Sequence, residues 1–268
     1  MKILKIQKEA VLEALESNIY RIDSVVYDNI GYVELVDAMG TDLDIVNAAK
    51  VSYNNEAREF GPKEEKLLWY LWFHKHTSPF EQVELKWRIK APAVVWWQFV
   101  RHRMAEYNAT SGRYTLYKDE YYTPPYWRGQ DKHNKQGSSE IRIELSEDLQ
   151  ARIEELTTES EAIYDELLAS GVSRELARLN RLGWRDYHTF IVKMNAHAFM
   201  NFLTKRDHKD AQWEIQQYAR AMKNSVLTII PATLTCFDTY RKEAAKFEEQ
   251  LNLIYKERFK DVGNKSTA

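Results

Sequence analysis

Residues 83–100 change their hydrophobic period near the middle, and this change constrains the fold more than any other feature of the sequence. Apolar and charged side chains alternate in 83–90 (VELKWRIK), as in an antiparallel strand with one face toward solvent. Pro92 suits the first position of a helix, and the apolar run AVVWWQFV follows it. A strand that leads directly into a buried helix indicates a fold with both sheet and helices.

The rest of the pattern predicts a helix-dominated α+β fold, with one domain favoured over two. Asp42 and Ser146 are the expected N-caps, and Gly171 is the expected stop of the long amphipathic helix. Residues 188–196 (HTFIVKMNA) fit a strand or a buried helix, since periodicity alone does not separate the two. Pro231 should break the helical pattern. We expect strands at 30–40 and 113–122, a polar surface loop at about 127–140, and helices at 43–51, 61–76, 146–170, 173–179, 196–206, 210–230 and 236–259.

Composition excludes several classes of protein. A 44% hydrophobic and 13% aromatic content suits a globular chain with a sizeable core, and a formal net charge of −2 gives no global attraction to nucleic acid or anionic lipid. One cysteine, Cys236, excludes an internal disulfide, and scattered histidines without HExxH give no metal site. Without a signal-like or membrane-spanning apolar segment, a cytoplasmic location is expected. The absence of GxGxxG and GxxxxGK argues against a Rossmann or P-loop nucleotide site.

A cluster of cations lies at the expected junction of helix and loop, in 101–115 (RHRMAEYNATSGRYT). Guanidinium groups match phosphate or carboxylate, and nearby aromatic residues offer the flat apolar surface that nucleotides and flavins need. Each arginine alone could also be an ordinary surface charge near a helix C-terminus. His102 could move protons or be structural, and Ser111 could be a nucleophile or a turn hydroxyl. The cluster therefore predicts an anion-binding pocket without a unique ligand.

The sequence resembles the flavin-dependent thymidylate synthases, also called thymidylate synthase complementing proteins. The family's Arg-His-Arg motif, followed after seven residues by Ser, matches Arg101, His102, Arg103 and Ser111, with GRY next. Order and spacing persist in further segments over about 31–219: GYVELVDAMGTDL, AAKVSY, HTSPFEQ, KAPAVVWWQFVRHR, SRELAR, NAHAFMNFLTKR and AQWEIQQYA.

This resemblance implies a helix-rich fold with a mixed or antiparallel sheet and a homotetramer whose active sites are shared between subunits. It implies reductive methylation of dUMP to dTMP, with methylenetetrahydrofolate as carbon donor and NADPH as reductant through FAD. It also implies a synthase domain at 31–230, between an N-terminal extension (1–30) and a C-terminal helical extension (231–268).

The resemblance also assigns residues. Ser111, Arg113 and Arg206 are the expected catalytic residues, and one turn is expected to hold both flavin and nucleotide. The expected dUMP contacts are Gln98, Ser111, Gly112, Arg113, Arg178 and Arg206. The expected FAD contacts are Ser52, His76, Ser78, Glu81, Arg101, His102, Arg103, Met104, Asn195, His197 and Asn201.

The sequence departs from the family pattern at two of these segments. Ala109 stands where the motif commonly has Glu, and His197 stands where many members have Arg. Two alternatives therefore stay open beside the synthase: an FAD-binding homologue with altered methyl transfer, and a non-catalytic nucleotide- or RNA-binding protein that uses arginine and aromatic stacking.

Overall fold

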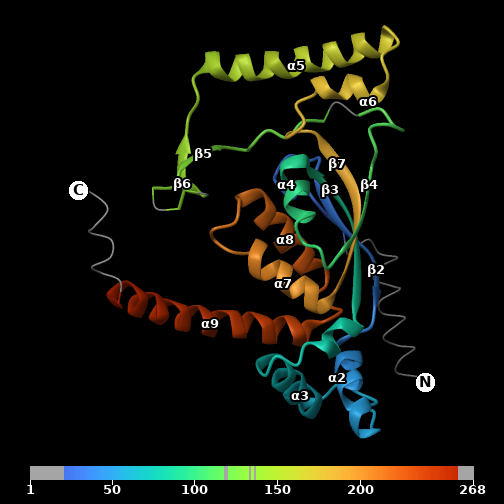
Figure 1. Ribbon diagram of the computed structural model, residues 1–268, viewed down its shortest axis with the longest axis vertical. Coiled ribbons are helices and arrows are strands. Elements are labelled where there is room, and N and C mark those ends of the chain that lie inside the picture. The colour runs from blue at the N-terminus through green and yellow to red at the C-terminus, as the bar shows by residue number, and fades with distance from the viewer. Residues whose placement is uncertain (1–20, 118–119, 133, 136, 259–268) are drawn as a thin grey trace.

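The computed structural model describes residues 21–258 except 118, 119, 133 and 136, and there it combines a five-stranded sheet, a two-stranded hairpin and helices (Figure 1). The strands are β1 (Arg21–Asp23), β2 (Tyr32–Met39), β3 (Glu84–Pro92), β4 (Glu106–Ala109), β5 (Trp127–Gln130), β6 (Ser138–Ile143) and β7 (Tyr187–Asn195). The α-helices are α2 (Asp42–Lys50), α3 (Pro62–Phe73), α4 (Ala93–Phe99), α5 (Glu147–Ala169), α6 (Arg174–Ala177), α7 (Ala196–Arg206), α8 (Trp213–Ser225) and α9 (Pro231–Arg258). The 3-10 helices are η1 (Val51–Tyr53), η2 (Ser78–Gln82) and η3 (Arg178–Asn180).

The five-stranded sheet has the order β1-β2-β3-β7-β4, and every neighbouring pair is antiparallel. The predicted alternation in β3 is confirmed, because Leu85, Trp87 and Ile89 are fully buried between more exposed neighbours. The ambiguous segment 188–196 forms most of β7, which pairs with β3 over its whole length. The mixed helix and sheet class with an antiparallel sheet is therefore confirmed.

Three helices, α4, α7 and α8, lie together on one side of the sheet (Figure 1). Their aromatic side chains interlock: Phe99 stacks on Phe202 at a centroid distance of 5.0 Å and meets Phe190 of β7 edge-on at 5.2 Å. This packing holds the ends of α4 and α7, and so the segment after α4, at fixed positions.

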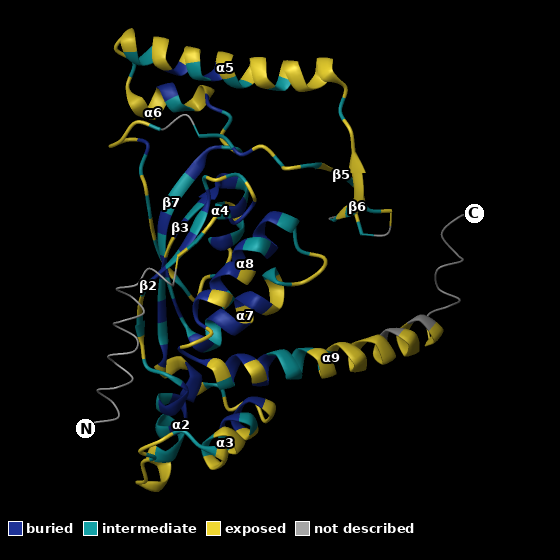
Figure 2. Cartoon of the chain, turned by 180° about the vertical axis from the view of Figure 1, so that it is seen from behind, coloured by how far each residue is buried: buried dark blue, intermediate teal, exposed yellow. Residues whose placement is uncertain are grey.

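Helix α9 begins in the core and ends at the surface, as its colouring in Figure 2 shows. Phe237 and Tyr240 meet Trp72 of α3 edge-on, whereas Phe247 and Leu251 further along are exposed. The start of the predicted C-terminal extension, residues 231–240, therefore packs in the hydrophobic core. Residues 259–268, like 1–20 of the predicted N-terminal extension, lie outside the described residues.

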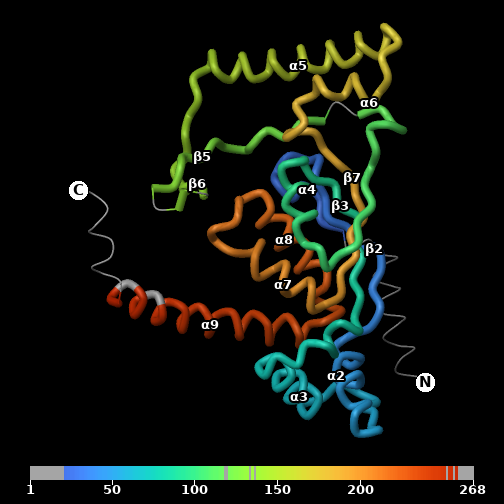
Figure 3. The backbone as a smooth tube through the Cα atoms, in the orientation of Figure 1, coloured from blue at the N-terminus to red at the C-terminus, as the bar shows by residue number. Residues whose placement is uncertain are grey.

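Helix α5 lies beyond one end of the sheet, over α6 (Figure 3). Its predicted limits are confirmed: the Ser146 hydroxyl accepts a hydrogen bond from the Leu149 amide at 3.3 Å, and Gly171 follows the helix with a φ of +82°. A positive φ favours glycine, which has no Cβ to clash. Tyr164 is buried against the Arg181 guanidinium, 4.9 Å from the ring centroid, and anchors the helix.

Some of the predicted element boundaries were wrong. Thr41, not Asp42, is the N-cap of α2, because the Asp44 carboxylate of the first turn accepts from the Thr41 amide at 2.7 Å. Pro92 ends β3 and is the N-cap of α4. Helix α8 already ends at Ser225, and Pro231 starts α9, which therefore begins before residue 236.

One predicted loop contains strands, and one predicted strand is largely a turn. The surface loop predicted at 127–140 contains β5 and the start of β6, which pair as a hairpin. The described part of the tyrosine-rich segment 113–122 forms a turn and one isolated bridge from Tyr121 to Asp186, while the strand lies earlier, at β4. Strand pairing of β4 with β7 is a long-range contact, and local composition carries no signal for it.

Candidate active site

The predicted site residues divide into three groups in the fold. The Arg206 cluster consists of Gln98, His102 and Arg206, with Arg101, Arg103 and Met104 beside it. The Ser111 turn consists of Ser111, Gly112 and Arg113, with Arg178 nearby. The η2–α7 face consists of His76, Ser78, Glu81, Asn195, His197 and Asn201, with Ser52 on the neighbouring η1.

Arg206, in the last turn of α7, hydrogen-bonds to the other two residues of the Arg206 cluster. Its Nε donates to His102 Nε2 at 2.9 Å, and its Nη2 donates to the Gln98 backbone carbonyl at 3.2 Å. Its Nη1 points toward Gln98 Oε1 at 3.5 Å. A guanidinium that binds α4 and the segment after it can hold both in place while it keeps donor capacity for a ligand.

His102 is neutral in this arrangement. Its Nε2 accepts from Arg206, so the ring proton lies on Nδ1, and the ring packs edge-on against Phe202 at 4.9 Å. Burial, together with the charges of Arg206 and Lys205, lowers the pKa of His102 from 6.5 to about 4. The histidine therefore orients the arginine at neutral pH and adds no charge.

Positive charge accumulates around this cluster. Arg101 and Arg103 are exposed, and within the described part of the chain neither forms an ion pair. Burial and then the charge of Arg101 lower the pKa of Arg206, as expected when cations are held close together. An anion bound here would relieve this repulsion.

Strand β4 separates the Arg206 cluster from the Ser111 turn. Glu106 pairs with Lys193 and Ala109 with Phe190, and the Thr110 amide then bonds to the Thr189 carbonyl at 2.9 Å. The two groups therefore lie beyond opposite ends of a strand that spans roughly 10 Å. The predicted single turn for both groups is wrong, because β4 lies between them. Local sequence carries no signal for this strand.

The Ser111 turn is packed closely against Tyr117. A Cβ atom on Gly112 would lie 2.3 Å from the Tyr117 ring, so a larger residue here would require the ring to shift. Arg178 lies beside the same tyrosine, and Arg113 Nε pairs with Glu175 of α6 at 3.0 Å. Among the described residues no histidine or carboxylate hydrogen-bonds to the Ser111 hydroxyl, whose oxygen accepts from the Arg113 amide at 3.3 Å.

The η2–α7 face is polar and partly exposed. His197 Nδ1 lies 3.3 Å from Glu81 Oε1, and the His197 ring meets Trp72 edge-on at 6.4 Å. Asn195 is the N-cap of α7, since its Oδ1 accepts from the Ala198 amide at 2.8 Å. Asn201, one turn after His197, projects from the same side of the helix. Helix α7 thus connects this face to Arg206, roughly 14 Å away along the helix axis.

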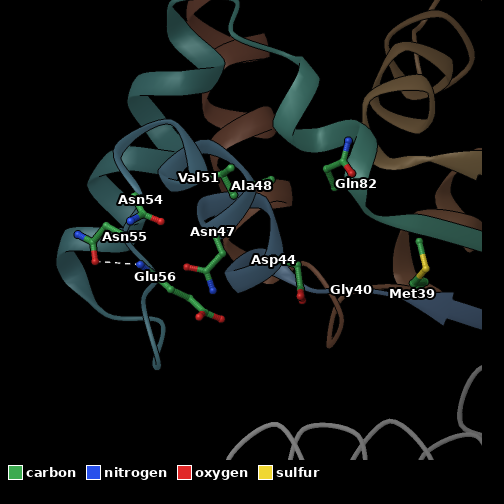
Figure 4. A pocket seen from close by; sticks show the side chains of 10 residues that line it. All are labelled: Met39, Gly40, Asp44, Asn47, Ala48, Val51, Asn54, Asn55, Glu56 and Gln82. Carbon is green, nitrogen blue, oxygen red and sulfur yellow. Dashed lines mark hydrogen bonds between the residues drawn. The ribbon is translucent and has the colours of Figure 1, made fainter.

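A pocket of about 610 Å³ opens between η1 and η2 (Figure 4). Val51, next to Ser52, and Gln82, next to Glu81, lie on its wall. Asn47, Asn54 and Asn55 supply most of the amide groups. This pocket was not predicted, although the Asn54-Asn55 pair is a turn signal in the sequence. In the structure Asn54 is left-handed, at φ +51°.

Three residues outside the predicted catalytic and binding sets also contact the site. Tyr117 packs on Gly112, and Gln212 and Glu214 at the start of α8 continue the hydrogen bonds of Gln98. The segment AQWEIQQYA marked this helix, but only tertiary contacts show which of its polar side chains turn inward.

The residues present fit a flavin dinucleotide. Such a ligand needs cations for its diphosphate, hydrogen-bonding groups for its rings and flat apolar surface. Arg101 and Arg103 provide exposed guanidinium groups, and Trp97 beside them is 56% exposed. His76, Ser78 and Glu81 offer hydrogen-bonding groups on the η2–α7 face.

The described part of the chain shows neither a metal cluster nor a membrane helix. Among these residues no group of three or more His, Cys, Asp or Glu side chains could hold a metal ion. Over the same residues, no helix has the length and apolar character that a membrane span requires.

Comparisons with known proteins give one consistent result. The family model of the thymidylate synthase complementing protein matches residues 34–232. The flavin-dependent thymidylate synthase of Thermus thermophilus is 41% identical over 215 residues, 80% of this chain and 78% of the relative. That of Thermotoga neapolitana is 41% identical over 210 residues, 78% of this chain and 92% of the relative.

Solved structures agree with these relatives. A crystal structure of the UMP/dUMP methylase PolB from Streptomyces cacaoi, bound with 5-Br dUMP, has a TM-score of 0.69 and 30% sequence identity. The similarity covers 78% of this chain and 95% of PolB. The chain belongs to the thymidylate synthase complementing protein family, a family of methyl-transferring enzymes.

Proposed function

We propose that this protein is a flavin-dependent thymidylate synthase, which methylates dUMP to dTMP with methylenetetrahydrofolate as carbon donor and NADPH as reductant through FAD. The observation that carries this proposal is the Arg206 cluster, in which the Arg-His-Arg motif, Gln98 and Arg206 meet. The names of the relatives support the flavin, and the PolB complexes with uridine nucleotide analogues support the substrate.

The two halves of the nucleotide site come from different subunits of a homotetramer. Beyond one end of β4 lie Gln98 and Arg206, and beyond the other lie Ser111, Gly112, Arg113 and Arg178. Because each group lies at its own end of the strand, we assign the two groups that hold one nucleotide to neighbouring chains. Exposed apolar side chains near both groups, Trp97 and Tyr114, are suited to burial between subunits.

The residues of the site have separate roles in the reaction. Arg206 and Gln98 bind the pyrimidine and stabilise the negative charge that develops on it during methylation. Arg113 and Arg178 bind the phosphate, since guanidinium forks match phosphate oxygens. FAD, when bound, supplies the hydride that protein side chains cannot. Ser111 orients the nucleotide, because no base contacts its hydroxyl among the described residues.

The flavin is bound by residues of two groups. Ser52, His76, Ser78, Glu81, Asn195, His197 and Asn201 bind FAD together with Arg101, His102, Arg103 and Met104. The synthase domain comprises 31–230, and a cytoplasmic location fits its small soluble substrates.

The test is a spectrum followed by an assay. The purified protein should be yellow or should bind added FAD, and should form dTMP from dUMP only when methylenetetrahydrofolate and NADPH are both present. Arg113→Ala should weaken dUMP binding and leave FAD bound. A colourless protein that neither binds FAD nor oxidises NADPH in the presence of dUMP would refute the proposal.

A second candidate keeps the flavin but changes the methyl transfer. Ala109, which stands where the family motif commonly has Glu, is half-buried on β4 opposite Phe190 and cannot hydrogen-bond to a nucleotide through its side chain. This candidate predicts FAD binding and NADPH oxidation without dTMP. Restored dTMP formation in Ala109→Glu would support it.

A further inference from the structure

A row of side-chain hydrogen bonds leads from the Arg206 cluster to the start of α8. Gln98 Nε2 donates to Gln212 Oε1 at 2.9 Å, and Gln212 Nε2 donates to Glu214 Oε2 at 2.9 Å. Three side chains from α4 and the start of α8 therefore form one connected row. An amide can offer either its oxygen or its nitrogen to a neighbour, so something must fix which way each one faces.

Glu214 fixes one end of this row, because an ionised carboxylate only accepts hydrogen bonds. The side chain is buried, and its Oε1 accepts from Arg128 Nη2 at 2.5 Å and from the Tyr122 hydroxyl at 2.7 Å. Burial alone would raise the pKa of Glu214, but the hydrogen bonds and the charge of Arg128 hold it below its ordinary value. Gln212 must therefore turn its nitrogen toward Glu214 and its oxygen toward Gln98.

Arg206 fixes the other end, because a guanidinium only donates. The Gln98 amide nitrogen is occupied by Gln212 and by the Val94 carbonyl at 3.2 Å, so the carbonyl oxygen is left on the side of Arg206 Nη1, 3.5 Å away. A reversed Gln98 amide would place NH₂ against guanidinium N–H groups and oxygen against the Gln212 oxygen.

We propose that Gln212 and Glu214 are positioning residues, which hold the Gln98 amide with its carbonyl toward the substrate. With the amide held in this way, Gln98 and Arg206 together select a uracil base over a cytosine base. Uracil has an N3–H donor between two carbonyl acceptors, which matches one amide oxygen beside guanidinium donors. Cytosine has an acceptor at N3 and an amino donor at C4, which would face groups of the same kind. A buried mismatch of this sort is costly, since a desolvated polar group loses its partner. The inference rests on the proposed function, because it takes dUMP as the ligand of Gln98.

The experiment measures binding of dUMP and of dCMP to the full-length FAD-loaded protein by isothermal titration calorimetry. The wild type should prefer dUMP. In Gln212→Met, which removes both hydrogen bonds of the linking amide, the preference for dUMP over dCMP should fall about five- to tenfold, the effect of roughly one hydrogen bond. Glu214→Gln should lower the preference in the same direction, since its amide can bond Gln212 in either orientation.

Tyr122→Phe is the matched control, because it removes a hydrogen bond to Glu214 Oε1 and leaves Oε2 with Gln212. It should lower thermal stability and keep the base preference. The absorbance ratio of flavin to protein checks that all variants retain FAD. Since Gln212 is half-buried at the N-cap of α8, Gln212→Met tests the idea even if Glu214→Gln does not fold.

The outcomes separate this inference from the function on which it rests. A wild type that binds neither nucleotide overturns both. A wild type that prefers dUMP, with unchanged preference in folded Gln212→Met, overturns the positioning role alone. Equal loss of preference in Tyr122→Phe and Gln212→Met would also overturn it, because general loosening of the core would then explain the effect.

Discussion

His102 holds its proton on Nδ1 while Nε2 accepts from Arg206, and this makes the motif sensitive to acid. The pKa of His102 is about 4 in the folded chain against an ordinary value of 6.5, so the unfolded chain binds the proton more tightly. Stability should therefore be lost as the pH falls from about 6.5 toward 4, because protonation turns the acceptor into a donor facing a guanidinium.

The prediction compares the wild type with His102→Gln, which can still accept from Arg206 but does not titrate. The free energy of unfolding, measured with urea, should fall between pH 7 and pH 5. The fall should be smaller in the variant by about 1 kcal/mol, a value that allows for solvent screening. His208→Gln removes an exposed histidine and serves as control. Identical pH dependence of the wild type and His102→Gln would contradict the assigned tautomer.

Gly112 leads to a second prediction at the scale of one residue. Gly112→Ala places a methyl group 2.3 Å from the Tyr117 ring, so the ring and the Ser111 turn must move apart. Affinity for dUMP should fall at least about tenfold, since small displacements of ligand-positioning groups are costly. The matched control is Gly183→Ala, where an added Cβ has nothing within 4 Å. Calorimetric titration with dUMP measures both, and equal affinities in the two variants would contradict the tight fit.

Asp42 shows how one element stabilises another that is distant in sequence. It is the first residue of α2, yet its carboxylate accepts from the Ala232 and Thr233 amides at 2.8 and 3.0 Å and from the Thr233 hydroxyl at 2.6 Å. These amides lie in the first turn of α9, where a helix has unpaired N–H groups. Asp42 therefore caps a helix, as expected from its residue type, but the helix is α9.

Asp42→Ala should consequently lower the free energy of unfolding by about 2 kcal/mol, because buried amides and a hydroxyl lose a charged acceptor. Asp148→Ala, at an exposed first-turn position of α5, should change it by less than about 0.5 kcal/mol. Urea denaturation followed by far-ultraviolet circular dichroism compares the two. If both variants lost equal stability, the capping of α9 by Asp42 would be ruled out.

Elements with strong local signals could be predicted from sequence, and elements made by distant pairing could not. The alternation of β3 and the Ser146 and Gly171 signals of α5 reflect each segment's own packing and capping, so they appear in the sequence. Strand β4 exists because it pairs with β7, which lies far later in the chain. The same holds in the site: Arg101 to Arg103 are visible as a motif, whereas the row from Gln98 to Glu214 exists only after α4 and α8 meet.

At the scale of the whole molecule, the proposed function assigns the Arg206 cluster and the Ser111 turn of one nucleotide site to two chains. In that proposal each chain contributes one half-site beyond either end of β4, and a closed symmetric oligomer can bring unlike halves of neighbouring chains together. Shared sites make activity depend on assembly. They also allow two inactive variants to restore each other.

Arg206→Ala and Arg113→Ala should each abolish dTMP formation alone and recover it in hybrid oligomers. After mixing under conditions that exchange subunits, about a quarter of the sites should combine an intact Arg206 half with an intact Arg113 half, since each half is intact with a chance of one in two. Ser111→Ala mixed with Arg113→Ala should recover no such fraction, because both changes lie in the same half. Native mass spectrometry verifies that hybrids form. Hybrids without recovered activity would show that each chain builds its own site, and the separation across β4 would then need another explanation.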